Sequence, residues 1–269
     1  MAAETLTDVI EVLEAAYPPA RAESWDAVGL VTGDPAQVVR RVLLAVDPVS
    51  AVAEEALEWG ADLIVVHHPL YLRGTTSVAT TTPKGRLLHT LIKHDIALYT
   101  AHTNADVANP GVSDALARAV GLVGDLVPLK PFPDDPWRGL GRIGELPREM
   151  PLGEFAALVA NGLPETSWGI RVAGDPSRPV SKVAVSGGAG DSLLGTAAAA
   201  GVDVFLTADL RHHPASEFVE SGGPALIDAA HWATEWPWLD SAASILHASG
   251  VTVETRVSAT VTDAWTKGY

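Results

Sequence analysis

The stretch GADLIVVHHP, residues 60–69, decides the fold of this 269-residue chain. Within it we predict a strand over DLIVVHHP (62–69), because its apolar run is short and uninterrupted, as is typical of a strand buried on both faces of an α/β sheet. Two histidines and a proline follow the run directly. Because open α/β sheets bind ligands just outside the carboxyl ends of their strands, His67 and His68 are candidate site residues.

The flanking segments alternate between helical and strand patterns. We predict helices over 6–17, 49–59, 85–94 and 111–120, and further strands over 41–47 and 96–102. Gly60 is expected to end the helix that precedes the stretch. Strands that alternate with helices predict a mostly parallel sheet covered by helices on both faces.

The second half of the chain repeats this pattern. GVDVFLTADLRHHP (201–214) has the same Gly-x-Asp opening, apolar run and His-His-Pro close, although residues 209–211 have no counterpart in the first copy. KVAVS (182–186) corresponds to the strand at 41–47, and ALIDAAHWATE (225–235) to ALYTAHTNAD (97–106). Features repeated in the same order predict an α/β protein of two related lobes, that is, an internal pseudo-repeat.

The boundary between the lobes is expected at PLKPFPDDP (128–136), which is rich in Pro and Asp and is the best candidate for a linker or crossover. The predicted lobes are therefore 1–127 and 128–269. The segment 240–269 is a candidate return to the first lobe.

Composition excludes several classes of site. The chain has no cysteine, so a disulfide framework, a thiolate nucleophile and a Cys-rich zinc or iron–sulfur site are excluded. The chain has 18 Lys and Arg against 33 Asp and Glu, a net charge of -15. It lacks the cluster of basic residues that nucleic-acid binding requires. No apolar run approaches the ~18 residues of a membrane span, and the acidic, amphipathic N-terminus is unlike a signal peptide. We expect a cytoplasmic protein that binds neither nucleic acid nor membrane.

Adjacent histidines suggest more than one metal ion. Neighbouring side chains of an extended segment point to opposite sides, so His67 and His68 suit two neighbouring ions better than one. Two-metal sites also need carboxylates. Asp106 and Glu235 stand at matching places after strand ends, with His231 beside Glu235. These five residues predict a site for two divalent ions per chain: zinc, iron, manganese, nickel or cobalt.

The roles of the other polar residues in the repeated motifs have more than one interpretation. His102, Asp209, His212 and His213 could orient metal ligands, carry protons, contact substrate or cap loops; we take His102, His212 and His213 as the candidate catalytic residues. Asp26 in SWDAVGL could form a turn or line a cleft, and the turn is favoured. The glycines of SGGAG (186–190) could cradle a phosphate or make a tight turn. The histidines outside the motifs are expected on the surface: His89, His94 and His247.

A family resemblance rests on six motifs in order. They are SWDAVGL, IVVHHPL, AHTNADVA, VAVSGGAG, FLTADLRHH and AAHWATE. Together they resemble the NGG-one-interacting-factor-three-like dinuclear-metal proteins, many of which carry the label "GTP cyclohydrolase one type two homologue". The resemblance implies two α/β lobes with the metal site in the cleft between them, and toroidal homohexamers. It places Glu235 as the bridge, His67 and Asp106 on one ion, and His68 and His231 on the other.

The function implied by the resemblance is metal-dependent hydrolysis. The substrate class would be a nucleotide or another phosphate-bearing heterocycle. The alternative is a non-catalytic metal-binding or ligand-sensing scaffold, because the residues contain no recognition motif for a particular substrate.

Overall fold

The chain builds two units, each around its own mixed sheet, in the computed structural model, which describes residues 4–269. The first unit comprises the described part of Met1–Ala105 together with Leu239–Thr262, and the second comprises Asp106–Trp238 and Asp263–Tyr269. The chain therefore leaves the first unit ahead of the Pro-rich stretch and later returns to it. Residues 1–3, the start of the acidic N-terminal segment, lie outside the described residues.

The first unit holds a five-stranded sheet of order β1-β4-β3-β2-β11, in which only β1 is antiparallel to its neighbour. Its elements are α1 (Leu6–Ala16), η1 (Pro19–Arg21), β1 (Gly29–Thr32), β2 (Arg41–Ala45), α2 (Ser50–Trp59), β3 (Leu63–Val66), α3 (Pro83–Lys93), β4 (Ala97–Thr100), α10 (Pro237–Ser249) and β11 (Glu254–Val257). The short helix α4 (Thr103–Asp106) follows β4.

Local signals set the start of α1 and the end of α2, the latter at Gly60 as expected. The Thr5 side chain accepts the amide hydrogen of Asp8 and the Asp8 carboxylate accepts that of Thr5, a capping box that begins α1. Gly60 ends α2 at φ 72°, a left-handed conformation that a residue with a Cβ adopts only at a cost.

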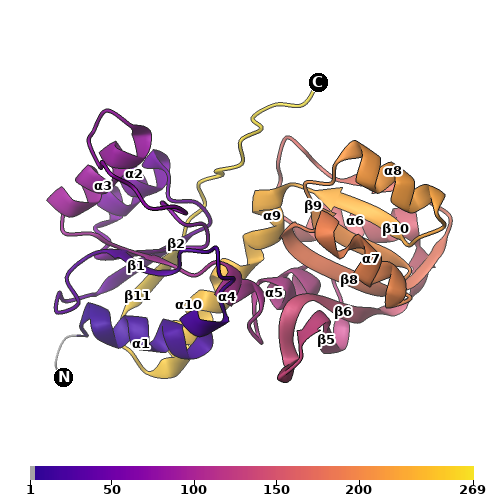
Figure 1. Cartoon of the computed structure of the whole chain (residues 1–269), viewed down its shortest axis with the longest axis horizontal. Coiled ribbons are helices and arrows are strands. Elements are labelled where there is room, and N and C mark those ends of the chain that lie inside the picture. Colours follow the sequence, from indigo (N-terminus) through magenta and orange to yellow (C-terminus); the bar gives the residue numbers. More distant parts are fainter. Residues whose placement is uncertain (1–3) are drawn as a thin grey trace. The chain divides into compact units, whose positions relative to one another are not determined.

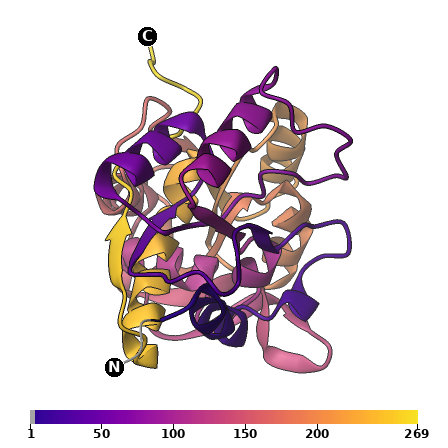
Figure 2. The ribbon, with the colours of Figure 1, turned by 90° about the vertical axis from the view of Figure 1, so that its left-hand side faces the viewer.

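Helices cover both faces of the first sheet. Figures 1 and 2 show α2 and α3 on one face and α1 and α10 on the other. Side chains that alternate along β2, such as Leu43 and Ala45, pack with Val52 of α2 and Leu91 of α3. The intervening Val42 and Leu44 are equally inaccessible to solvent. Burial on both faces explains why the apolar runs of these strands are uninterrupted.

The second unit holds a six-stranded sheet of order β5-β6-β8-β9-β10-β7, in which β8, β9 and β10 are parallel and the other pairs antiparallel. Its elements are α5 (Val112–Ala119), β5 (Val123–Phe132), β6 (Asp135–Pro151), α6 (Leu152–Gly162), β7 (Arg171–Ala173), β8 (Pro179–Ala189), η2 (Asp191–Leu193), α7 (Leu194–Ala199), β9 (Val204–Ala208), α8 (His212–Glu220), β10 (Ala225–Ala229) and α9 (His231–Glu235).

The parallel strands of the two units follow the same plan. The first unit runs β2-α2-β3-α3-β4 and the second β8-α7-β9-α8-β10, and in each the middle strand of the series lies between the other two. Phe205 and Leu226 pack against α7, with Phe218 of α8 beside them, whereas α5 and α9 contact β8. The predicted α/β class with two lobes is confirmed. The first sheet is mostly parallel as predicted, whereas the second is more evenly mixed because the long strands β5 and β6 and the short β7 add antiparallel pairs beside its parallel series.

The Pro-rich stretch at 128–136 is β-structure rather than a linker. It forms the end of β5 and the start of β6, which pair as a hairpin. Pro128 and Pro131 lie in β5, the edge of its sheet, where proline is best tolerated because the strand has a hydrogen-bonded neighbour on one side only.

The second His-His pair does not lie at a strand end. β9 ends at Ala208, and Asp209 takes the place that His67 has after β3. His212 and His213 begin α8 instead, because residues 209–211 are inserted between the strand and the pair. Among residues 4–269, no helix is long and apolar enough to cross a membrane.

Candidate metal centre

Three histidines gather at the carboxyl ends of two neighbouring strands of the first unit. His67 and His68 follow β3, and His102 follows β4, which pairs in parallel with β3. One nitrogen from each ring lies within 4.8 Å of the others. Three nitrogens this close, on rigid strand ends, are a donor set that borderline divalent metals accept.

His67 and His68 converge although they are adjacent in sequence. Their ring centroids lie 5.1 Å apart, because the two residues sit in a bend beyond the strand rather than in extended backbone. The alternation that suggests two separate ions does not hold here. Residue alternation therefore does not set the number of ions that this cluster holds.

Each ring of this cluster is held through Nδ1. His67 donates to the carbonyl of Ala101 at 2.9 Å, and His68 to the Asp47 carboxylate at 2.7 Å. His102 donates to the Asp26 carboxylate at 2.9 Å. A proton fixed on Nδ1 leaves Nε2 as the lone-pair atom, which is the arrangement that proteins use to orient metal-binding histidines.

Asp26 is the buried partner of His102 rather than only a turn former. Its side chain is inaccessible to solvent and accepts hydrogen bonds from Thr103 through both the amide and the hydroxyl, and from the Ala27 amide. Burial works to raise the pKa of Asp26, but the hydrogen bonds from His102 and Thr103 outweigh it and lower this pKa below its ordinary value. Asp26 therefore stays ionised and fixes the His102 ring.

The pKa of His102 is also lowered. Burial is the main cause and the neighbouring His67 adds to it, while Asp26 acts in the opposite direction. A neutral imidazole is the form that binds metal or accepts a proton, so His102 has the protonation state that either role requires.

The second unit supplies an acidic group of residues around one histidine. His231 and Glu235 are the first and last residues of α9, which places them on one face of a single helical turn. His231 Nδ1 donates to Asp209 at 2.7 Å, and its Nε2 lies 2.9 Å from Glu235 Oε1. Glu235 is 2% exposed.

These two carboxylates change the protonation of His231. Burial opposes its charged form, yet Glu235 and Asp209 prevail and raise the pKa of His231 to about 11. The ring is therefore a cation in the protein without metal. A divalent ion would replace that proton, so the group fits a metal by its charge as well as by its donor atoms.

Glycines at the end of β8 make room for Glu235 and His231. A Cβ at Gly188 would lie 2.6 Å from Glu235 Oε1 and 3.2 Å from His231 Nε2, and its φ of +65° is left-handed. The Gly188 amide donates to Thr234 Oγ1 at 2.9 Å. The SGGAG motif thus allows close approach of the candidate ligands, which accounts for its glycines without a phosphate.

The remaining predicted residues are spread over both units. Asp106 ends α4 and is half-buried, and it is not a member of the cluster of three histidines. His212 and His213 are exposed at the start of α8. The histidines expected on the surface are all exposed: His89, His94 and His247. Trp232 and Trp238 are buried and pack in the core.

Asp47 is the site residue that the sequence analysis missed. It follows β2, holds His68 and accepts a hydrogen bond from the hydroxyl of Thr262. An acidic residue directly after a buried strand is the signal that could have identified it, by the same strand-end argument that identified the histidines.

Comparisons with known proteins agree with the motifs. The family model described as Duf34/NIF3 (NGG1p interacting factor 3) matches residues 4–264. A Streptomyces coelicolor protein named GTP cyclohydrolase 1 type 2 homolog is 59% identical over 267 residues, which cover 97% of this chain and 93% of that protein. A Bacillus cereus protein related to NIF3 has a similar structure, with a TM-score of 0.89 and 25% identity over 98% of this chain and 99% of the other.

A Mycobacterium tuberculosis relative differs in length. It has the same name, GTP cyclohydrolase 1 type 2 homolog, and is 40% identical over an alignment of 367 residues that covers 97% of this chain and 96% of the relative. Because this alignment is longer than the chain itself, the relative carries additional residues that this chain lacks.

Proposed function

Because the chain belongs to the Duf34/NIF3 (NGG1p interacting factor 3) family, we propose that it is a metal-dependent hydrolase with two divalent ions per chain. The proposed ligands are His67, His68, Asp106, His231 and Glu235. The observation that carries the proposal is the way the imidazoles are held. Each of the three proposed histidine ligands donates Nδ1–H to a carbonyl or carboxylate, the contact that orients a metal-binding imidazole.

The division of ligands between the ions follows the family resemblance. Glu235 would bridge both ions, His67 and Asp106 would hold one, and His68 and His231 the other. Two carboxylates would balance part of the positive charge that neutral imidazoles leave uncompensated.

Two bound divalent ions would lower the pKa of water and polarise the bond under attack. His102 would hold or accept a proton at Nε2, because Asp26 fixes its Nδ1. His212 and His213, exposed at the start of α8, are the further candidates for moving protons or contacting substrate. The substrate class that we propose is a nucleotide or a similar phosphate-bearing molecule, which rests on the name of the relatives.

Metal analysis and a turnover panel test this proposal together. Elemental analysis after reconstitution with each divalent metal should approach two ions per chain, and a panel of nucleotides and phosphoesters should reveal turnover that Glu235→Ala abolishes. Glu217→Ala, on the exposed face of α8, is the matched control. Tight metal binding without turnover on any member of the panel would identify a scaffold instead. A firm ratio of one ion, unchanged by His68→Ala, would overturn the two-ion site.

Assembly is a separate part of the proposal. We propose a toroidal homohexamer, which rests on the family resemblance alone. Light scattering at micromolar concentration should give six times the chain mass of 28.1 kDa. A monomer under those conditions would contradict it.

A further inference from the structure

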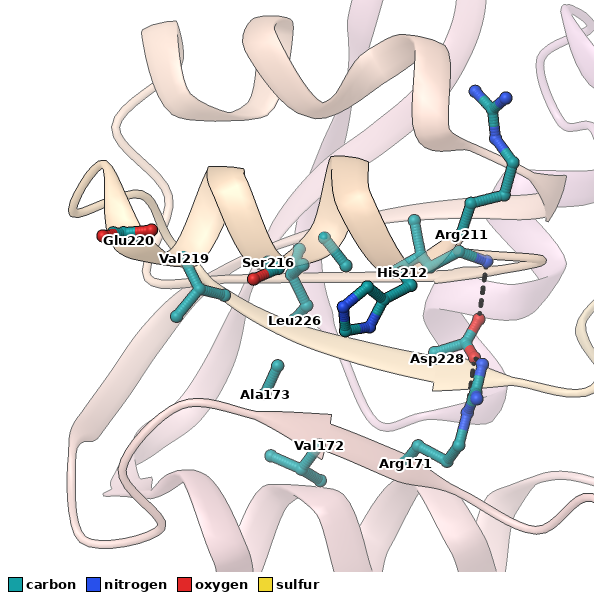
Figure 3. A pocket seen from close by; sticks show the side chains of 12 residues that line it. Arg171, Val172, Ala173, Arg211, His212, Ser216, Val219, Glu220, Leu226 and Asp228 are labelled. Atoms are coloured by element: carbon teal, nitrogen blue, oxygen red, sulfur yellow. Dashed lines mark hydrogen bonds and ion pairs between the residues drawn. The ribbon is translucent and has the colours of Figure 1, made fainter.

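The second unit contains a cavity that includes none of the proposed metal ligands. It has a volume of about 590 Å³ and lies between α8 and the strands β7 and β10, the last two at that edge of the sheet (Figure 3). Pockets that hold small organic molecules are ~300–1,000 Å³. The cavity is therefore large enough for a ligand of about two fused rings.

Apolar side chains form most of its walls. They come from β7, β10 and α8: Val172, Ala173, Leu226, Ala215 and Val219. Val172 is 40% exposed and Val219 37%, so apolar surface on opposite walls is open to solvent. A flat apolar body lying between the strands and the helix would remove this surface from water, which favours binding.

A charged side chain fixed in place marks one end of the cavity. Arg171 on β7 donates to Asp228 Oδ2 through Nε at 2.8 Å and also through Nη2. Asp228 is 5% exposed, and its Oδ1 accepts the Leu210 amide at 3.1 Å. The Arg171 guanidinium also lies over the Trp168 ring, 4.2 Å from the centroid. Both Asp228 oxygens are thus engaged, whereas the Nη1 donors of Arg171 take no part in the ion pair.

The remaining polar side chains show which end of the cavity would bind a negatively charged group. Figure 3 shows the His212 ring reaching into the cavity from the start of α8, which is the end of this helix nearer to Arg171 and Asp228. Arg211 points away in the same view and pairs with Asp191 at 2.6 Å. Glu220 lies at the opposite end of α8. Donors therefore gather at one end, and the carboxylate that they face is already satisfied.

We propose that this cavity binds a small organic anion with a planar apolar body. The body lies between α8 and Val172, Ala173 and Leu226, and the carboxylate, sulfonate or phosphate group of the ligand meets Arg171 and His212. Complementary charge selects the anion, because a cation would have to compete with Arg171 for Asp228. The proposal does not depend on the proposed hydrolase activity.

Three probes with one ring system test the charge preference. Calorimetric titration of the full chain would use 2-naphthoate, 2-naphthylmethanol and 2-naphthylmethylammonium. The naphthoate should bind ~10-fold or more tightly than the alcohol, because charge-assisted hydrogen bonds are the stronger ones, and the ammonium should bind most weakly. Equal affinity for all three would overturn the proposal.

Matched substitutions test the location. Ser216→Trp fills the cavity from an exposed position of α8 and should abolish naphthoate binding, whereas Glu217→Trp, one residue along and outside the cavity, should leave it intact. Loss in both variants, or in neither, would place the binding elsewhere.

The charged end needs its own pair of variants. Arg171→Gln should reduce naphthoate affinity to that of the alcohol. Arg211→Gln should not, because Arg211 lines the cavity but its guanidinium points away from it and pairs with Asp191. If Arg171→Gln fails to fold because Asp228 is left unpaired, Arg171→Gln combined with Asp228→Asn removes both charges and should give the same reduction. Unchanged naphthoate affinity in the folded variant would refute the role of Arg171.

Discussion

His102 and His231 occupy matching places in the two units, and their protonation is opposite. Each stands four residues ahead of an acidic residue, Asp106 or Glu235. Burial and the neighbouring His67 lower the pKa of His102, whereas Glu235 and Asp209 raise that of His231 to about 11. The difference teaches that a repeated motif fixes the position of a side chain, while the charges around it fix its chemistry.

The largest effect that we expect is a difference in metal affinity between a variant of Glu235 and a variant of His102. Glu235→Gln removes a negative charge at nearly constant shape and should weaken metal binding by ~100-fold or more, since the loss of a residue that only supports a ligand already costs ~10–100-fold. His102→Ala should leave metal content nearly intact and lower activity. Metal titration of both variants is the measurement. If His102→Ala empties the site while Glu235→Gln keeps its ions, the roles are reversed.

A second prediction tests whether the glycine beside Glu235 and His231 is needed for metal binding. Gly188→Ala places a Cβ against Glu235 and His231 and should reduce metal affinity by ~10-fold or more. Gly201 has nearly the same left-handed φ, +62°, with no atom within 4 Å of the added Cβ.

Both alanine variants should therefore lose ~1–2 kcal/mol of unfolding free energy from backbone strain, measured by denaturant unfolding. Only Gly188→Ala should also lose metal. A similar loss of metal in Gly201→Ala would show that strain, not the approach to Glu235, is the cause.

Substitution of the carboxylates that hold His68 and His231 should change metal affinity by a smaller factor. Asp47→Asn weakens the bond to His68 Nδ1 and should reduce metal affinity by ~10-fold. Asp209→Asn should cost less, because the Asp209 side chain is 56% exposed and solvent screens its charge. Competition with a chelator would rank the two variants. An Asp209→Asn loss larger than that of Asp47→Asn would contradict this order.

The fourth prediction concerns the pH dependence of the stability of the metal-free protein. The raised pKa of His231 contributes stability that is present at neutral pH and is lost as pH rises through about 11. The lowered pKa of His102 acts at the other side: stability is complete above its ordinary value of 6.5 and falls as pH drops through the lowered value.

Histidine NMR of chelator-treated protein should therefore show a protonated His231 and a neutral His102 at pH 8. Thermal unfolding against pH should lose its alkaline limb in His231→Gln and part of its acidic limb in His102→Gln. Two histidines that both titrate near 6.5 would remove the contrast between the units.

Short-range patterns predicted much of this molecule correctly. The apolar run at 63–66 became β3, Gly60 ended α2, and His67 and His68 came to lie at a strand end beside His102. These features follow from backbone sterics, burial on both faces of a sheet and chain continuity, which a sequence displays directly.

Identical sequence motifs did not always occupy equivalent positions in the structure. The His-His-Pro of the second copy resembles that of the first, yet three inserted residues move His212 and His213 into α8 and leave Asp209 at the strand end. The Pro-rich stretch resembles a linker, but an edge strand accepts it. In both cases the position in the sheet, which spacing alone does not reveal, decided the structure.

The sequence by itself determined the α/β class, the alternation of strands and helices, and the place of His67 and His68 after a strand end. Only the tertiary structure decided their partners and charges: that Asp26 holds His102, Asp47 holds His68 and Asp209 holds His231. Asp26 is 76 residues from His102 in the chain. Patterns along a sequence report local backbone preference and burial, whereas a hydrogen bond or a pKa depends on groups that distant segments bring within a few ångströms.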